Sequence, residues 1–301
     1  MAISEPLTSK KIKEVRLTHV ELSKMRIRPA SKTGVKISAA IAVLILASVV
    51  LSMAGNPNME WNVVGKYLFA SLTINGVLVT LYLTIISLAI GIIGGIVVAV
   101  MRLSGNPVLY NIAGLYIGLF RGTPLLVQII FWGYMGALFK NVELGIPFTN
   151  LTFFSVPTNQ LIGPVVAAIL ALGLNEVAYA CEIVRGGILG VDKGQTEAAY
   201  SLGMPPRRTM LRIVLPQAMR TVIPALGNEV INMLKMTSLV SVIAGADLLT
   251  NLQNVYSQTY QVIPLLIVAS IWYCGLSAIL SVPQRYLERR FGRGHKSGGD
   301  R

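Results

Sequence analysis

The sequence predicts an all-α, polytopic membrane protein with about six transmembrane helices. Of its 301 residues, 53% are hydrophobic and only 13% are charged, whereas a soluble globular domain carries about 25% charged residues. Mean hydropathy is +0.65. Long uncharged runs recur along the chain, and lysine and arginine concentrate at its two ends. These observations together indicate a chain that crosses the bilayer several times.

The hydropathy pattern places six helices. About 20 residues at 1.5 Å each cross the hydrocarbon core, so the longer uncharged runs must also include interfacial or extramembrane backbone. The first run lies too far from the start, and is too weakly followed by a cleavage pattern, to be a signal peptide. We expect helices near residues 36–54, 70–101, 118–139, 161–189, 220–244 and 262–284. The predicted organisation is a basic segment at 1–35, a transmembrane domain at 36–290 and a tail at 291–301.

The flanking charges orient these helices. Nine lysines and arginines precede the first span and six follow the last, so both termini are expected to be cytoplasmic by the positive-inside rule. Six spans then place Lys66 and Lys140 outside and the basic loop at 191–219 inside. The net charge of +13 is explained by this orientation signal and by attraction to anionic headgroups. The sequence therefore predicts no nucleic-acid binding.

The residues that catalytic, metal or nucleotide chemistry would need are missing from the predicted spans. Cys181 and Cys274 lie within spans, where a free cysteine behaves as a small hydrophobe. His19 and His295 lie in the charged tails, and no metal-binding pattern is visible. No G-x-x-x-x-G-K-[ST] phosphate loop occurs. We expect a chain that is not an enzyme, with no catalytic residue, no metal and no cofactor of its own.

One cytoplasmic loop has the features of a docking element. It reads EAAYSLGMPPRRTMLRIVLP from Glu197 to Pro216. The run QTEAAYSLG favours a short helix whose alanines allow another surface to approach closely, and Gly203 can end that helix in a left-handed cap. Pro205 and Pro206 then force a turn before a second helix. The expected product is a compact helix, turn and helix on the cytoplasmic face.

The spacing of this loop resembles, at every fixed position, the EAA signature of the permease subunits of ATP-binding-cassette (ABC) importers. Residues 120–133, 175–188 and 226–243 look like the permeases of polar amino-acid importers, which handle histidine, arginine, glutamate, glutamine, cystine and opines. The resemblance covers roughly residues 70–290. Members of that family have a core of five spans, so the resemblance implies a type I importer permease fold with one additional N-terminal helix at 36–54.

The resemblance also implies the function and the partners. The chain would be a permease in the bacterial cytoplasmic membrane that moves a polar amino acid inward. A separate ATPase dimer would bind ATP and Mg²⁺ and dock on the loop. A second permease subunit, identical or paralogous, would lie beside the chain, and an extracytoplasmic solute-binding protein would deliver the substrate. The implied coupling residues are Glu197, Ala198, Ala199, Gly203, Arg207 and Arg208.

Ionisable residues inside the predicted spans mark further candidate sites, because each costs a few kcal/mol at the bilayer centre and should face an interior or a cavity. They are Arg121, Glu176, Glu182, Arg185, Glu229 and Lys235. With 3.6 residues per turn, Arg185 lies about 60° from Glu182 and about 180° from Glu176. This favours a structural (i, i+3) ion pair of Glu182 with Arg185. Glu176 is left to form a polar face with Tyr179.

A polar stripe on the next helix is the second half of a predicted substrate site. Asn228, Asn232 and Lys235 recur at i, i+4 and i+7. An α-amino acid requires a cation or amides for its carboxylate and a carboxylate or carbonyls for its ammonium, and this stripe facing Glu176 and Tyr179 would supply both. The alternative is that Glu176 and Lys235 pair with each other or across a subunit interface. Many family members carry a small residue in place of Glu176, so the resemblance does not settle specificity.

Two other charged residues have less defined roles. Arg121 precedes Gly122-Thr123-Pro124, and because proline suits a first helical turn, we expect Arg121 at the cytoplasmic start of its span. A gating contact is the alternative for this arginine. Glu229 points about 100° away from Asn228 and is assigned to the dimer interface or the gate.

Two other classes of function compete with the importer permease. An ion-coupled secondary amino-acid transporter would be expected to show inverted repeats with paired broken helices, and no convincing internal repeat is found. An intramembrane enzyme would need a catalytic constellation, and no histidine, metal cluster or serine elbow lies in a predicted span. The importer permease is therefore favoured, with the ion-coupled transporter as its alternative.

Overall fold

The computed structural model describes residues 32–145 and 152–292, so most of the predicted segments at 1–35 and 291–301 lies outside the described residues. The chain divides into two units at Met59 and Glu60. The first contains α2 (Lys32–Ala54) and the short 3₁₀ helix η1 (Pro57–Met59). The side chains of α2 from residue 34 onward are all exposed. This apolar helix therefore buries no surface within its own unit.

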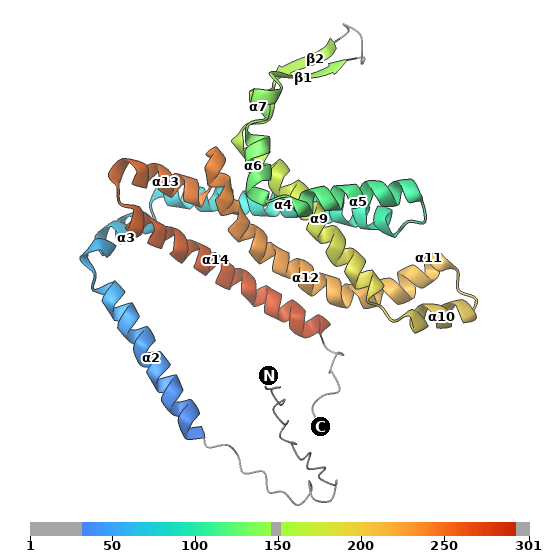
Figure 1. Ribbon diagram of the computed structural model, residues 1–301, viewed down its shortest axis with the longest axis horizontal. Coiled ribbons are helices and arrows are strands. Elements are labelled where there is room, and N and C mark those ends of the chain that lie inside the picture. The colour runs from blue at the N-terminus through green and yellow to red at the C-terminus, as the bar shows by residue number, and fades with distance from the viewer. Residues whose placement is uncertain (1–31, 146–151, 293–301) are drawn as a thin grey trace, which may run out of the picture. The chain divides into compact units, whose positions relative to one another are not determined.

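The second unit is almost entirely helical (Figure 1). Its long helices are α4 (Ser71–Leu103), α5 (Pro107–Gly122), α9 (Pro164–Leu189), α12 (Leu215–Met236) and α14 (Val262–Phe291). The shorter ones are α3 (Trp61–Leu68), α6 (Leu125–Gly133), α7 (Met135–Leu138), α8 (Thr158–Leu161), α10 (Lys193–Ser201), α11 (Pro206–Thr209), η2 (Met210–Val214), η3 (Thr237–Ile243) and α13 (Leu248–Thr259). Across the described parts of both units, four helices could cross a membrane, or up to six if each of two bent pairs is one span. This agrees with the predicted number.

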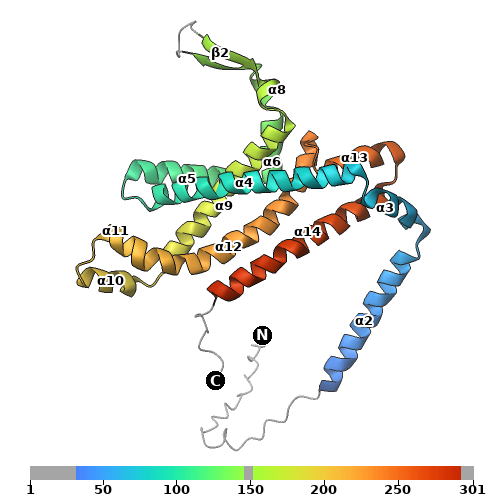
Figure 2. The ribbon, with the colours of Figure 1, turned by 180° about the vertical axis from the view of Figure 1, so that it is seen from behind.

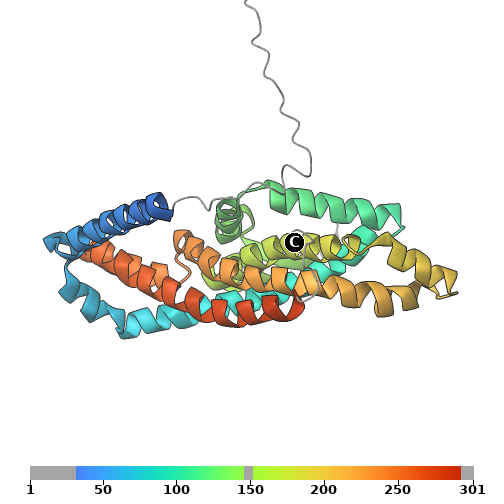
Figure 3. The ribbon, with the colours of Figure 1, turned by 90° about the horizontal axis from the view of Figure 1, so that it is seen from below.

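The packing of α4 against α9 forms the centre of the second unit. Figure 2 shows the two helices crossing. Glycines of α4 allow this close approach: a Cβ at Gly95 would lie 2.6 Å from the Cβ of Ala180, and Gly91 faces the side chain of Glu176. α12 runs beside α14 (Figures 1 and 3) and also contacts α9. The buried apolar core where α4, α6, α9 and α12 meet includes Leu83, Ile129, Leu172 and Met233.

The third predicted span, 118–139, is wrong in its bounds and in its continuity. α5 begins earlier, at Pro107, because the side chain of Asn106 caps the helix by accepting a hydrogen bond from the N–H of Val108 at 2.9 Å. α5 ends at Gly122, and α6 follows at an angle of 97°. The segment is a broken helix pair rather than one straight span.

Proline is the physical reason for this break. Pro124 has no N–H to donate and disfavours a helical conformation in the residue before it, so Thr123 is extended, with φ −113° and ψ 141°. Pro124 precedes α6 as its N-cap. The prediction that Arg121 opens a span is accordingly wrong, since Arg121 lies in the last turn of α5.

The fifth predicted span, 220–244, belongs to a helical path that begins earlier, at Pro206, and ends at Ile243, before a break and a further helix. α11, the π-helical segment η2 and α12 follow one another without a gap, and the 3₁₀ helix η3 continues to Ile243. Ala244 and Ala246 then adopt positive φ values of 55° and 59°. Asp247 caps the start of α13 by accepting a hydrogen bond from Leu249 N at 3.0 Å. The direction changes by 43° at this point. The strained break separates a second bent pair.

A β-hairpin is the one departure from all-α structure in the described residues. β1 (Asn141–Gly145) pairs antiparallel with β2 (Thr152–Pro157), and Asn141 lies opposite Pro157. The hairpin extends beyond α7 and α8 (Figures 1 and 2). It lies between the third and fourth predicted spans, and α9 begins after it at Pro164 rather than at 161. β-branched and aromatic residues in this segment favour strands.

Candidate functional sites

The loop between α9 and α12 folds as the predicted helix, turn and helix. Asp192 caps α10 by accepting from Gly194 N at 2.6 Å. At the other end, Gly203 has φ +75°, its N–H donates to Tyr200 O, and Met204 N donates to Ala199 O at 3.0 Å. These two bonds form a Schellman motif, which satisfies carbonyls that a helix end leaves free. Pro206 then begins α11, so both ends of α10 are fixed.

The loop exposes both apolar and basic side chains. Leu202 is 83% exposed and Tyr200 is 49% exposed. Arg207 and Arg208 are also exposed. Of the three EAA residues, Glu197 and Ala198 are exposed, while Ala199 is buried against the rest of the loop. Exposed leucine, tyrosine and arginine side chains in one loop outside the predicted spans are typical of a protein-docking surface.

Three predicted intramembrane charges form a cluster where α5 meets α9. Arg185 donates to both carboxylate oxygens of Glu182, with Nη2–Oε2 of 2.7 Å and Nε–Oε1 of 3.1 Å. This bidentate geometry matches the expected (i, i+3) pair. Arg121 Nη1 lies 3.7 Å from Glu182 Oε2, and the guanidinium of Arg121 lies 5.3 Å from the centre of the Tyr179 ring. Tyr179 is therefore in contact with this cluster.

Glu176 does not share an exposed face with Tyr179. Its side chain is only 2% exposed and packs against Gly91 of α4, whereas Tyr179 is 38% exposed. Glu176 Oε1 has no hydrogen-bond partner among the described residues. The expected shared polar face is thus divided, because the glycine on α4 lets that helix cover Glu176.

The stripe on α12 is accessible. Asn228, Asn232 and Lys235 are all exposed, and Asn232 Nδ2 donates to Glu229 Oε1 at 3.5 Å. Within the described part of the chain, Lys235 forms no ion pair, so the structure does not bring it together with Glu176. Lys235 lies in the last turn of α12, and its backbone carbonyl accepts a hydrogen bond from Ser238 Oγ at 2.7 Å.

Two buried amides at the α5–α6 break were missed by the sequence analysis. Gln128 Nε2 donates to Phe120 O at 2.9 Å and to Thr123 Oγ1 at 2.8 Å. Asn175 Nδ2 on α9 donates to Gln128 Oε1 at 3.2 Å. These bonds satisfy backbone groups that the break leaves free and tie it to α9. The available sequence signal for Gln128 is an amide four residues after Pro124 in an otherwise apolar run.

Comparison with known proteins reveals the family. The family described as "Binding-protein-dependent transport system inner membrane component" matches residues 91–293. The arginine transport system permease protein ArgU of Corynebacterium glutamicum is 41% identical over 268 residues, covering 89% of this chain and 83% of that protein. The L-cystine transport system permease protein TcyB of Bacillus subtilis is 35% identical over 236 residues, covering 78% of this chain and 92% of that protein.

Solved structures agree with this result. The crystal structure of an amino acid ABC transporter with histidines is 37% identical, with a TM-score of 0.61, covering 73% of this chain and 94% of that one. The chain belongs to the polar amino-acid ABC transporter permeases. An inward-facing structure of the MetNI methionine ABC transporter, at 17% identity and a TM-score of 0.53, shares the fold.

Membership confirms the predicted family and the type I importer permease fold. This ABC permease is a multi-pass inner-membrane protein, with its candidate spans distributed as described above. α2 lies wholly before the matched region at 91–293. Within the described residues of the permease, no group of three or more His, Cys, Asp or Glu side chains could hold a metal ion.

Proposed function

We propose that this permease moves a polar amino acid into the cytoplasm, and that a separate ATPase dimer drives it by docking on the loop at 191–219. ATP and Mg²⁺ would be bound by that ATPase, so this chain would carry neither a cofactor nor a catalytic residue. The observation that carries the proposal is the loop itself: α10 is capped at both ends, and Leu202, Arg207 and Arg208, which follow the EAA residues in the chain, are all exposed. Apolar surface of this kind is stabilised when a partner covers it.

The structure of the loop supports a mechanism in which a displacement of α10 is passed to α12. α10 is fixed at both ends by Asp192 and by the Gly203 cap, so it can move as a rigid unit. α11, η2 and α12 form one continuous helical path from the loop to the exposed residues Asn228, Asn232 and Lys235. A displacement of the loop would therefore shift the predicted substrate stripe. No such path would be required in an ion-coupled transporter.

The stripe on α12 is proposed to bind the substrate carboxylate. Lys235 supplies a cation without a competing ion pair among the described residues, and the two asparagines supply amide donors. Tyr179 lies exposed on α9 and would line the same route. Glu176 is covered by α4, so it would reach a substrate ammonium only in a state where α4 and α9 have separated.

Arginine is the first substrate to test, because two similar permeases are named for arginine transport. Glutamine, histidine and cystine complete the panel of substrates.

The proposed partners are a second permease subunit and an extracytoplasmic solute-binding protein, with both termini of this chain in the cytoplasm. The complex, reconstituted in proteoliposomes with its binding protein outside, should accumulate a radiolabelled member of the panel only when ATP is inside. Accumulation driven by an ion gradient without ATP would instead favour a secondary transporter.

Docking can be tested separately from transport. In a variant with Cys181 and Cys274 replaced by serine, Leu202→Cys should cross-link to a cysteine placed on the ATPase surface that contacts the loop. Phe153→Cys on β2 is the matched control, because this side chain is 75% exposed and lies at the other end of α9. Equal cross-linking of both positions would argue against specific docking at the loop.

A further inference from the structure

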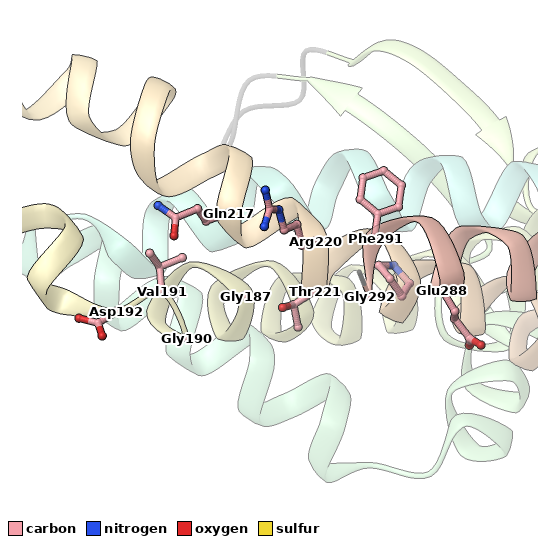
Figure 4. A pocket seen from close by; sticks show the side chains of 11 residues that line it. Gly187, Gly190, Val191, Asp192, Gln217, Arg220, Thr221, Glu288, Phe291 and Gly292 are labelled. Carbon is pink, nitrogen blue, oxygen red and sulfur yellow. The ribbon is translucent and has the colours of Figure 1, made fainter. Parts of the chain in front are cut away.

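The two ends of α12 have different surroundings. Near its beginning, Arg220 and Thr221 are exposed and line a cavity of about 650 Å³ together with the ends of α9 and α14 (Figure 4). At its other end, Thr237 starts η3 and is fully buried. The neighbours of Thr237 therefore decide where the last turn of α12, which carries Lys235, is placed.

A closed cluster of side-chain oxygens lies around Thr237. Its other members are Thr80 on α4, Asp247 before α13, Thr250 on α13 and Tyr273 on α14. The hydroxyl of Tyr273 is buried and lies beside Thr80, Thr237 and Asp247. The side chains of these three residues are fully buried. Separate parts of the chain thus meet around one carboxylate, and we call this set the Asp247 cluster.

Asp247 is the charged member of the cluster. Its Oδ2 accepts a hydrogen bond from Leu249 N at 3.0 Å, and its Oδ1 accepts one from the hydroxyl of Thr250. Among the described residues Asp247 forms no ion pair. A buried charge without an ion pair is costly unless hydrogen bonds satisfy it, and hydrogen bonds to a carboxylate are stronger than neutral ones. The carboxylate therefore fixes the first turn of α13.

The same turn is fixed to α4. Leu248 N donates to Thr80 Oγ1 at 3.1 Å. A Cβ at Gly76 would lie 2.7 Å from Leu248 Cα, so the backbones of α4 and α13 approach closely at this point. Asp247 thus has a defined place against a long helix of the permease.

Tyr273 connects Asp247 to the predicted substrate stripe. The Tyr273 hydroxyl has no completed hydrogen bond among the described residues, and the Asp247 carboxylate is the strongest acceptor beside it. Thr237, which also lies beside this hydroxyl, follows Lys235 by two residues and donates its own hydroxyl to Leu234 O at 2.7 Å. A displacement of Asp247 or Tyr273 would therefore move the end of α12 that carries Lys235.

We propose that Asp247 is a positioning residue for substrate binding, which acts through Tyr273 and Thr237 on Lys235. The inference rests on the proposed function, because it takes Lys235 to bind the substrate carboxylate. Lysine has a long and flexible side chain, and a binding group stays within about 0.5 Å of its productive geometry only when packing and hydrogen bonds around it are fixed. Asp247 is fully buried and supplies such support without contacting the substrate.

The test measures equilibrium binding of the transported member of the panel to the purified complex in lipid nanodiscs. Asp247→Asn keeps the size of the side chain but replaces an acceptor oxygen by a donor group. It should weaken binding by about 3-fold to 10-fold, as for the loss of one hydrogen bond. In the Lys235→Met background the same substitution should have no further effect on affinity, because residues that act through one another are not additive.

Thr80→Val is a second variant of the Asp247 cluster. It removes the hydroxyl that accepts from Leu248 N and should weaken binding only when Lys235 is present. Thr84→Val is its matched control, because Thr84 is buried one turn further along α4 and its hydroxyl donates to Thr80 O of the same helix; it should keep wild-type affinity. If Asp247→Asn does not assemble, Thr80→Val decides the question by the same comparison.

The possible outcomes separate this inference from the proposed function. Equal weakening by Asp247→Asn with and without Lys235 would indicate a general structural role and overturn the inference. Unchanged affinity in Asp247→Asn, together with weakened binding in Lys235→Met, would also overturn it and leave the proposed function intact. Unchanged affinity in Lys235→Met would overturn the proposed role of the substrate stripe, and this inference with it.

Discussion

Replacing Gly91 by alanine should destabilise the contact between α4 and α9. A Cβ at this position would lie 2.5 Å from Glu176 Cβ and closer still to Glu176 Cγ, whereas non-bonded carbons prefer about 3.5–4.0 Å. The two helices must separate by roughly 1 Å, or the glutamate must leave its rotamer. Overpacking of this kind costs typically about 1–3 kcal/mol.

A double mutant isolates the contact. Glu176→Gly removes both clashing atoms and leaves the nearest remaining atom, the Glu176 carbonyl carbon, at 3.3 Å from the new Cβ. Glycine in a helix costs about 1 kcal/mol, so this single variant has a penalty of its own. Gly91→Ala combined with Glu176→Gly should nevertheless be more stable than the sum of the two singles by about 1–2 kcal/mol, as for contacting residues.

The measurement is the thermal midpoint of the purified permease in detergent. Gly118→Ala on α5 is the control, because a Cβ there meets nothing within 4 Å; it should be neutral or slightly stabilising through helix propensity. Gly91→Ala should lower the midpoint by several degrees, at roughly 2–4 °C for each kcal/mol. If Gly91→Ala behaves like Gly118→Ala, the described packing of Glu176 is wrong.

Three further outcomes are expected. Gly203→Asp should insert normally but uncouple ATP hydrolysis from uptake, because it places a charged side chain at the end of α10, where the ATPase is proposed to approach closely. Gly203→Asn has nearly the same shape without the charge, and both residues can adopt φ +75°, so the asparagine variant should retain more coupling. Full transport by the aspartate variant would count against the docking role. Cysteines at Gly145 and Gln195 should label from outside and inside intact cells respectively, and labelling from one side would refute the topology. Lys235→Met should weaken substrate binding by about 5-fold to 150-fold, equivalent to about 1–3 kcal/mol; Lys140→Met should not, and Lys235→Met should be additive in stability with Glu176→Gln, since the two residues are not paired.

Local sequence was sufficient to predict the structure of the loop at 191–219. Gly203, Pro205 and Pro206 each restrict the backbone through their own covalent structure, so the left-handed cap and the following turn could be predicted without knowledge of any neighbour. The same holds for the Glu182–Arg185 pair, because residues three apart on one helix are neighbours wherever that helix lies. Hydropathy likewise predicted the number of spans, since their length depends on the bilayer.

The break at Pro124 could be recognised only in part. Proline signals either the first turn of a helix or the end of the previous one, and the sequence analysis took the first interpretation. The structure shows that α5 already extends from Pro107 to Gly122, because Asn106 caps it. Gln128 and Asn175 then satisfy the freed backbone groups, an arrangement that requires α9 to be in place.

The sequence by itself determined that the chain has several membrane spans and that the loop at 191–219 is a capped helix, turn and helix, because these depend on composition and on local backbone chemistry; its resemblance to the EAA signature indicated the permease family. Tertiary structure alone decided which polar residues share a face. Glu176 and Tyr179 lie three residues apart on α9, yet Gly91 of α4 lets that helix cover Glu176, while Tyr179 stays exposed beside Arg121. Exposure depends on what the neighbouring helix places opposite each residue, and helical periodicity within one segment carries no information about that neighbour.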